Sequence, residues 1–313
     1  MQIKNLFWYV LNKPLGQAEA LGAKLAKKPF APCGATQELS QGWVAPLSQG
    51  EWVYEAHGAQ LLMLKQERRL LPASVVNDYL QTKVEQFEAQ EGYPPSRKVR
   101  QQMKEDLTLE LLPKAFTKQV RVPVVIFPKQ GWLFVLTSSA KTADDTTAFL
   151  RETIESLPIS LVSTEVSPSF TMTQWLSAPG ELPSDWQLGE EVELRDAEDA
   201  VVKVRNQMLF SDEVQVHLDS GKHATKLVLI WQDQVSLLLQ DDLAIKRIKV
   251  LNEEEAPADA MADDISRFAH EFAVSCQWVV PLCESLLNAL GGLEKALGAS
   301  QARSHTAPEL APA

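Results

Sequence analysis

The feature that most constrains the fold is a pair of helical patterns set between strand-like segments. Apolar residues recur at helical spacing over residues 74–90 and 96–112, which are joined by the sequence EGYPP. The double proline ends the first helix, because proline lacks the backbone N–H that a helix interior needs, and Ser96 can cap the second. So short a connection predicts two antiparallel helices, a helical hairpin.

Other elements are predicted on both sides of the hairpin. Strands are expected at 5–11 and in GWVAPL, QLLMLKQERRLL, KQVRVPVVIF, GWLFVLTSS, VVKVRNQML, TKLVLIWQ, QVSLLLQ and AIKRIKV. Helices are expected at 14–28, at 142–157 (opened by Thr142 or the Asp pair after it) and at 264–297, broken or bent at Pro281. The acidic, proline-containing residues 178–200 favour a loop, residues 252–264 favour a charged linker, and the tail from Gly298 favours disorder. The pattern predicts an irregular α+β chain with antiparallel sheets.

Composition and cysteine usage favour a soluble cytoplasmic protein. The chain has 313 residues, of which 45% are hydrophobic and 23% charged. No apolar run approaches the roughly 18 residues that a membrane span needs, and the N-terminal segment has no cleavage site of a signal peptide. Three cysteines make no disulfide framework, which indicates a reducing compartment.

The formal net charge of −11 is unevenly divided along the chain. Residues 65–140 carry twelve cations against eight acids, whereas residues 141–200 carry three cations against thirteen acids. Such asymmetry is compatible with a nucleic-acid-binding surface on an acidic body, and equally with scattered surface charge.

The second helix of the hairpin begins with a run of cations. Residues 96–104 hold four cations and no acid, and Arg97, Arg100 and Lys104 share one helix face. Cations at a helix N-terminus oppose the helix dipole, at a cost of roughly a few tenths of a kcal/mol each. This cost suggests that they serve a partner outside the helix, and a solvated surface helix is the equal alternative.

Two strands of the C-terminal half each present cations on one face, by period-two alternation. One strand, VVKVRNQML, carries Lys203, Arg205 and Gln207 on one face. The other, AIKRIKV, is expected to place Arg247 and Lys249 on the same face as Ile245. Lys222 and Lys226 are the remaining candidate phosphate contacts in this half. Because no ladder of aromatic residues accompanies them, phosphate contact without base readout is expected, which predicts sequence-independent and salt-sensitive binding.

Phe116 follows the second helix of the hairpin, just past Pro113. A lone phenylalanine is more often part of a core. If the hairpin projects from the body, however, Phe116 has little core to enter, and an interface becomes its natural destination.

Enzyme and metal motifs are not found in the sequence. DSGKHATK has the Gly-Lys pair of a phosphate-binding loop, but His223 replaces the required Ser/Thr and Val216 replaces the first glycine. No Glu-x-Lys or Asp-x-Lys of a metal-dependent nuclease occurs, and the histidines lack metal-ligand spacing. We therefore expect no catalysis, metal or cofactor, and we expect Cys276 and Cys283 to be core residues.

Seven segments together resemble the recombination-associated RdgC family in order and spacing. They are FAPCGATQELSQGWVAPL, ERRLLPASVV, LLPKAF, VVKVRNQML, HLDSGKHATKLVLIWQDQ, DDLAIKRIKV and LLNALGGLEKAL. The likeness runs from about residue 3 to residue 297. The chain departs most clearly from the family around EGYPPSRKV and beyond Gly298.

The resemblance implies a homodimer closed into a ring, with a positively lined hole through which duplex DNA passes. It implies DNA binding without sequence preference, with single-stranded DNA as a second ligand to test, restraint of RecA-promoted strand exchange, and association with the bacterial nucleoid. It also implies a central portion (1–72 and 118–170), a tip hairpin (73–117), a base portion (171–297) and a tail (298–313).

The resemblance also assigns roles to particular residues. Phe116, in LLPKAF, would close the ring as a gate between the two tips, and Lys203, Arg205 and Gln207 would lie near the DNA. The candidate DNA contacts of the tip region are then Arg97, Arg100, Lys104, Lys114 and Lys118.

Two other functions are compatible with the sequence. One is an adaptor whose acidic segments 178–200 and 251–264 bind a basic partner, with incidental contact to DNA. The other is a nuclease or another DNA-processing enzyme.

Overall fold

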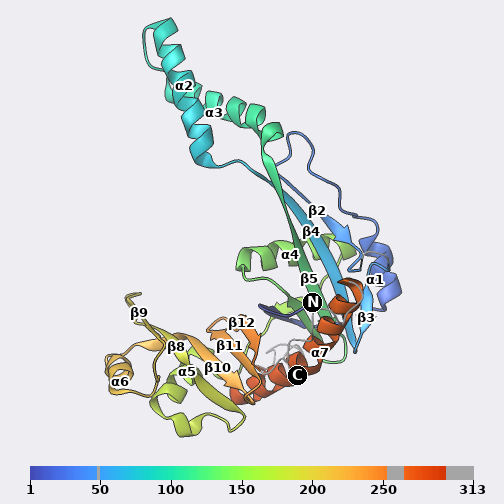
Figure 1. The fold of residues 1–313 in the computed structure, drawn as a ribbon, viewed down its shortest axis with the longest axis vertical. Coiled ribbons are helices and arrows are strands. Elements are labelled where there is room, and N and C mark those ends of the chain that lie inside the picture. Colours follow the sequence, from blue (N-terminus) through green and yellow to red (C-terminus); the bar gives the residue numbers. More distant parts are fainter. Residues whose placement is uncertain (48–49, 252–263, 294–313) are drawn as a thin grey trace, which may run out of the picture.

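The computed structural model describes residues 1–47, 50–251 and 264–293, which form a crescent (Figure 1). Its body contains two antiparallel sheets, a helical hairpin projects from one end, and a long C-terminal helix runs past both sheets. The expected α+β fold with antiparallel sheets is confirmed. The linker expected before residue 264 and the tail expected beyond Gly298 fall outside the described residues.

The first sheet has the strand order β2-β4-β5-β6-β1-β7, and β3 also pairs with β4. The strands are β1 (Phe7–Leu11), β2 (Leu39–Val44), β3 (Tyr54–Ala56), β4 (Ala59–Leu70), β5 (Phe116–Phe127), β6 (Trp132–Val135) and β7 (Ile159–Leu161). β4 and β5 are much longer than their neighbours, so their far halves leave the sheet as a two-stranded ribbon (Figure 1). This ribbon carries the hairpin.

The hairpin consists of α2 (Ala73–Glu91) and α3 (Arg97–Leu111), followed by a 3₁₀ turn at Leu112–Lys114. α2 ends at Gly92, which has the left-handed conformation that glycine adopts without strain (φ 77°). As predicted, Ser96 caps α3: its hydroxyl accepts a hydrogen bond from the Val99 backbone N–H at 3.4 Å. Leu80 of α2 packs with Leu107 of α3 in a small separate core.

Two further helices cover the first sheet, and both depart from the sequence-based expectation. α1 (Ala18–Leu25) begins four residues later than expected, because Gly16 adopts φ 95° and interrupts the chain before it. α4 (Ala140–Ile154) begins earlier than expected. Its N-cap is Ser139, whose hydroxyl accepts from the Thr142 N–H at 3.2 Å, rather than Thr142 or the Asp pair.

The second sheet has the strand order β12-β11-β10-β8-β9. The strands are β8 (Trp186–Arg195), β9 (Val201–Arg205), β10 (His223–Trp231), β11 (Val235–Gln240) and β12 (Ile245–Val250). The prediction of a loop over residues 178–200 is wrong, because β8 lies there. Val192 and Leu194 are buried in the core and alternate with the acids that suggested a loop. α5 (Pro168–Ser177) and α6 (Asp212–Asp219) were not predicted.

One apolar core joins the two sheets. It contains Trp8 and Phe134 from the first sheet, Leu227 from the second and Phe272 from the C-terminal helix α7 (Asp264–Ala289). α7 continues through Pro281 rather than breaking there, and Cys276 and Cys283 are buried as predicted. Within the described residues, no helix is long and apolar enough to span a membrane.

Candidate nucleic-acid interface

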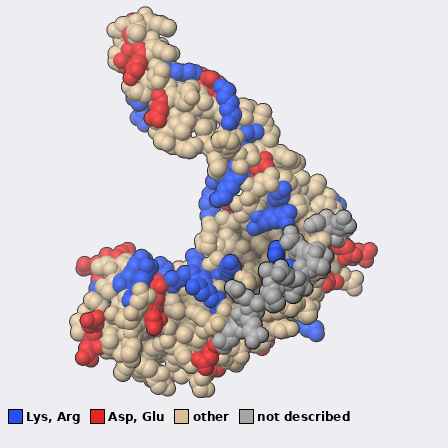
Figure 2. Space-filling model, viewed as in Figure 1, with Lys and Arg blue, Asp and Glu red and all other residues tan. Residues whose placement is uncertain are grey.

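Lysine and arginine side chains gather around the hollow of the crescent (Figure 2). They cover the surface of the second sheet that borders the hollow, and they recur along the body and the hairpin. Acidic side chains in this view gather at the far end of the hairpin and around the outer rim, and some also lie beside the cations of the second sheet and of the hairpin. The helices α5 and α6 lie on the side of the second sheet that faces away from the hollow (Figure 1).

The cations of the second sheet form a set that we call the basic sheet face. Its members are Arg195, Lys203, Arg205, Lys222, Lys226, Arg247 and Lys249. Lys203 and Arg205 are exposed on β9, while Val202 and Val204 of the same strand turn toward the core, so the predicted alternation is confirmed. β9 is an edge strand, and its partner β8 supplies the acids.

Glu193 of β8 holds cations from three strands. Its carboxylate lies 2.8 Å from Lys226 Nζ of β10, 3.2 Å from Lys203 Nζ of β9 and 3.8 Å from Arg195 Nη2. Burial alone would raise the pKa of this carboxyl, but the hydrogen bonds from Lys226 and Lys203 outweigh it and hold the pKa below its usual value. Glu193 therefore carries its charge at neutral pH and fixes these cations on one face.

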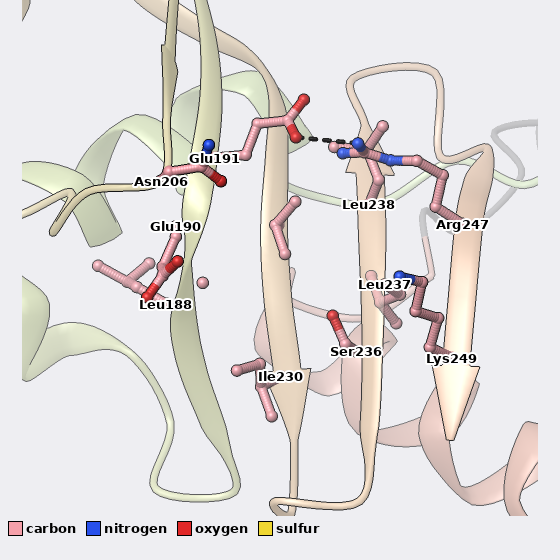
Figure 3. Close-up of a pocket in the computed structure, with 12 residues that line it drawn as sticks. Leu188, Glu190, Glu191, Asn206, Ile230, Ser236, Leu237, Leu238, Arg247 and Lys249 are labelled. Atoms are coloured by element: carbon pink, nitrogen blue, oxygen red, sulfur yellow. Dashed lines mark hydrogen bonds and ion pairs between the residues drawn. The ribbon is translucent and has the colours of Figure 1, made fainter. Parts of the chain in front are cut away.

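Glu191 of β8 holds the two arginines at opposite edges of the sheet. Its Oε1 lies 3.3 Å from Arg205 Nε of β9, and its Oε2 lies 2.9 Å from Arg247 Nη1 of β12 (Figure 3). The hydrogen bond from Arg247, followed by the charges of Arg247 and Arg205, lowers the pKa of this carboxyl despite its partial burial. The basic sheet face is thus built on carboxylates that each serve more than one cation.

The remaining candidates of the second sheet are placed differently from one another. Lys222 is mostly buried, and its Nζ lies 2.7 Å from Asp196 Oδ2, so it is less available than Lys203. Lys249 is exposed, and no ion pair is found for it among the described residues. The position predicted for Gln207 is wrong: β9 ends at Arg205, Asn206 adopts φ 56°, and the Gln207 amide donates to Glu213.

The face predicted for β12 also needs a correction. Ile245 is buried with Ile248, whereas Arg247 and Lys249 are exposed. A register shift in the β11–β12 pairing, with Arg247 at φ 52°, adds a residue and breaks the alternation. Arg247 and Lys249 share the exposed side, and Ile245 does not join them.

Four cations of the hairpin stand on α3. Arg97, Lys98 and Arg100 are exposed and Lys104 is half-buried, and no ion pair is found for any of them in the described part of the chain. On the other side of α3, the apolar residues become more buried along the helix: Val99 is exposed, Met103 is half-buried, and Leu107 and Leu111 are buried. Lys114, by contrast, pairs with Glu110 at 3.6 Å.

The ribbon of β4 and β5 adds Lys65, Arg68 and Arg121, which sequence analysis did not single out, beside the predicted candidate Lys118. In the register of this pair, Lys65 lies opposite Arg121 and Arg68 lies opposite Lys118. Like charges directly opposite each other destabilise a strand pair, so an external anion would stabilise this arrangement. Only the strand register shows these pairings, and it could not be predicted from residue spacing.

Phe116 is the first residue of β5 and is 85% exposed. It lies opposite Leu70, which is also exposed, at the end of the ribbon. Arg69 fixes this end: its guanidinium donates to the carbonyls of Leu112 at 3.1 Å and Ala115 at 3.3 Å. Phe116 thus stays outside the core, as expected for the case in which the hairpin projects from the body, and Arg69 is the supporting residue that sequence analysis missed.

Within the described residues, no group of three or more His, Cys, Asp or Glu side chains is placed to hold a metal ion. The fold and the site together define a crescent-shaped α+β protein whose cations surround a hollow wide open on one side.

Comparison with known proteins finds a family model and several relatives that match nearly the whole chain. A family model described as "Putative exonuclease, RdgC" matches residues 1–293. The chain is 37% identical to the recombination-associated protein RdgC of Tolumonas auensis, over 95% of this chain and 100% of that protein. It is 37% identical to the protein of that name from Pseudomonas syringae pv. syringae (94% and 98%) and 36% identical to that from Dechloromonas aromatica (93% and 98%). The chain belongs to the RdgC family of recombination-associated proteins.

Proposed function

We propose that the protein is a non-enzymatic, sequence-independent binder of duplex DNA that acts as a dimeric ring around the duplex. Its role in recombination is then to limit RecA-promoted strand exchange by occupying DNA. Membership of the RdgC family gives the recombination context. The basic sheet face, with the cations of the hairpin and ribbon around one hollow, is the observation that carries the proposal.

The chemistry of these cations favours phosphate rather than bases as the ligand. They lie on a sheet face and a helix face where the described residues form no ladder of exposed aromatic rings, so stacking on single-stranded bases has little support. Exposed lysines and arginines on a regular surface suit contact with a phosphate backbone, which carries no sequence information. A net charge of −11 does not oppose this, because binding depends on the local potential in the hollow.

Closure into a ring is the part of the proposal that rests on Phe116. A single crescent leaves one side of the hollow open (Figure 1). A second copy related by a two-fold axis would close it, and such an interface must be self-complementary. Phe116 and Leu70 form an exposed apolar pair at the ribbon end, and meeting their own copies would remove both from water. In this arrangement the hairpins are the tips and Phe116 is the gate.

Binding of two unrelated duplexes of equal length, across a salt series, tests the proposal. We expect equal affinities that fall by about a thousandfold or more between 50 and 200 mM salt, as for proteins making six or more phosphate contacts. No binding even at low salt would overturn the DNA function and favour the adaptor with acidic docking segments. Mg²⁺-dependent loss of the input DNA would overturn the non-enzymatic part and favour a nuclease.

A further inference from the structure

Glu191 occupies an unusual place in the second sheet, because its two partners come from the two edge strands. Arg205 lies on β9, next to β8, while Arg247 reaches Glu191 from β12, with β10 and β11 between them. Figure 3 shows the Arg247 side chain extending across the sheet toward Glu191. One carboxylate thus links two arginines that would otherwise point into solvent from opposite edges of the same sheet face.

The backbone is irregular at both ends of this bridge. Near Glu191, the Val228 side chain of β10 lies over Gly189 of β8, where a Cβ would be only 2.5 Å from Val228 Cγ1. The β8–β10 register shifts at the same place, between Leu227 and Leu229. At the other end, the irregular pairing of β12 turns Arg247 outward, and its backbone N–H donates to Asn5 Oδ1 at 3.1 Å. Bulges of this kind re-aim side chains, and here both irregularities lie beside the bridging residues.

The bridge crosses a cavity of about 400 Å³ in the exposed sheet face. Leu188, Ile230 and Leu238 are among its apolar lining residues, and Lys249 also lines it (Figure 3). Separating the Glu191–Arg247 pair leaves each group open to a partner that arrives from the hollow.

The exposure of the paired groups separates Glu191 from Glu193. The side chains of Arg205 and Arg247 are 61% and 48% exposed and that of Glu191 is 25% exposed, whereas that of Glu193 is only 9% exposed. A phosphate arriving from the hollow can therefore reach both arginines. Carboxylate and phosphate are bound by guanidinium through the same fork of N–H donors, so the two anions compete for one position.

We propose that Glu191 is an internal competitor of DNA phosphate: it holds Arg205 and Arg247 in the free protein, and phosphate displaces it on binding. The inference rests on the proposed DNA binding and concerns its regulation. Because phosphate must displace the Glu191 carboxylate, each arginine–phosphate contact stabilises the complex less than it would if the arginine had no partner in the free protein. The protein therefore holds DNA less tightly than its cations would allow, and it can be displaced or moved along the duplex.

A charge-neutral variant with a matched control tests this role. Glu191→Gln and Glu190→Gln each remove one negative charge from adjacent residues of β8, but Glu190 is exposed and makes no ion pair among the described residues. We expect Glu191→Gln to raise affinity for a duplex at 0.15 M salt roughly fivefold, by removing the competing charge beside the phosphates. Glu190→Gln should change it far less.

The salt dependence gives a second readout that a merely structural role would not move. In the wild type, a displaced Glu191 takes up a cation from solution, which offsets part of the counterion release from DNA. Without this carboxylate, the slope of log affinity against log salt should steepen by about one. Glu191→Ala removes the same charge with a different side chain. Thermal unfolding shows whether either variant has a folding defect, and the other variant then carries the test.

Three outcomes would overturn the inference in different ways. Equal gains for Glu191→Gln and Glu190→Gln would mean that only net charge matters. Weaker binding by both Glu191 variants, in folded protein, would mean that Glu191 orients the arginines for DNA rather than competing with it. If the wild type itself fails to bind duplex at low salt, the proposed function fails first, and this result is distinguishable because all variants would share it.

Discussion

At the residue scale, Glu193 is the carboxylate on which the basic sheet face depends for its stability. It lies almost buried among Lys203, Lys226 and Arg195, and its pKa lies below the usual value. We expect Glu193→Gln to lower the free energy of unfolding at pH 7 by about 1–2 kcal/mol, because two lysines lose their charged acceptor but can still be solvated. Denaturant unfolding, with Glu190→Gln as the matched control, measures this difference.

The pH dependence of stability provides a separate test of the same residue. Folding lowers the pKa of Glu193, so the unfolded chain binds the proton more tightly than the folded protein. The contribution of this carboxylate is therefore complete above the unfolded pKa, about 4.3 for Glu, and is lost as pH falls through the lower folded value. Glu193→Gln should flatten the loss of stability in this acidic range. An unchanged acid profile in the variant would contradict the role given to Glu193.

Arg69 is the second residue with a testable structural role. Its guanidinium donates to backbone carbonyls on both sides of Pro113 and to Gly34, which ties the hairpin base to the first sheet. We expect Arg69→Met to speed backbone hydrogen exchange over residues 112–118 by about tenfold or more, because several charge-assisted hydrogen bonds are lost. Arg69→Lys, which has fewer N–H donors, should give an exchange rate between those of the wild type and Arg69→Met. Exchange that stays at the wild-type rate would contradict this anchoring.

At the element scale, the hairpin could be predicted from sequence and β8 could not. The hairpin depends on local signals: the double proline, the Ser96 cap and an apolar stripe that the next helix covers. In β8, the apolar residues that reach the core alternate with acids whose partners lie on β9, β10 and β12. A run of acids predicts a loop as long as the cations that pair with them are unknown. Those cations come from neighbouring strands, and the spacing of residues in one strand does not reveal which strands are its neighbours.

The same limit applies to the candidate site. Alternation identified Lys203 and Arg205 because β9 is a regular strand, and it failed for Gln207 and on β12, where the backbone leaves the regular pattern. Glu191 and Arg247 are 56 residues apart, and only the folded sheet brings them together. Such a bridge could not be predicted from one sequence.

The central element-scale prediction concerns β9. Lys203→Glu combined with Arg205→Glu should lower duplex affinity at 0.1 M salt by about thirtyfold or more and reduce the salt slope by about two. Lys13→Glu with Lys27→Glu makes the same charge change beside α1, which Figure 1 shows on the side away from the hollow, and should have little effect. Equal losses in the two variants would mean that overall charge, not the basic sheet face, controls binding.

At the scale of the whole molecule, the proposed dimeric ring rests on the crescent and its exposed ribbon end. Phe116→Ser should leave the subunit folded, since this side chain buries almost nothing, and should weaken closure of the ring. We expect the variant to show a smaller mass at low concentration by sedimentation or light scattering, and faster loss of bound duplex. Thr117→Ser, one residue along β5, is a conservative control. Wild-type mass and wild-type retention in the Phe116 variant would remove this residue from the gate.

Retention on closed and open DNA is the most direct test of encirclement. The protein is bound to a nicked circular duplex and to the same duplex in linear form, and both complexes are then challenged with salt above that at which phosphate contacts hold. A closed ring predicts that complexes on the circle persist, that those on linear DNA slide off the ends, and that cutting the circle releases the protein. Equal loss from the two forms would contradict the ring and leave an open crescent bound by charge alone.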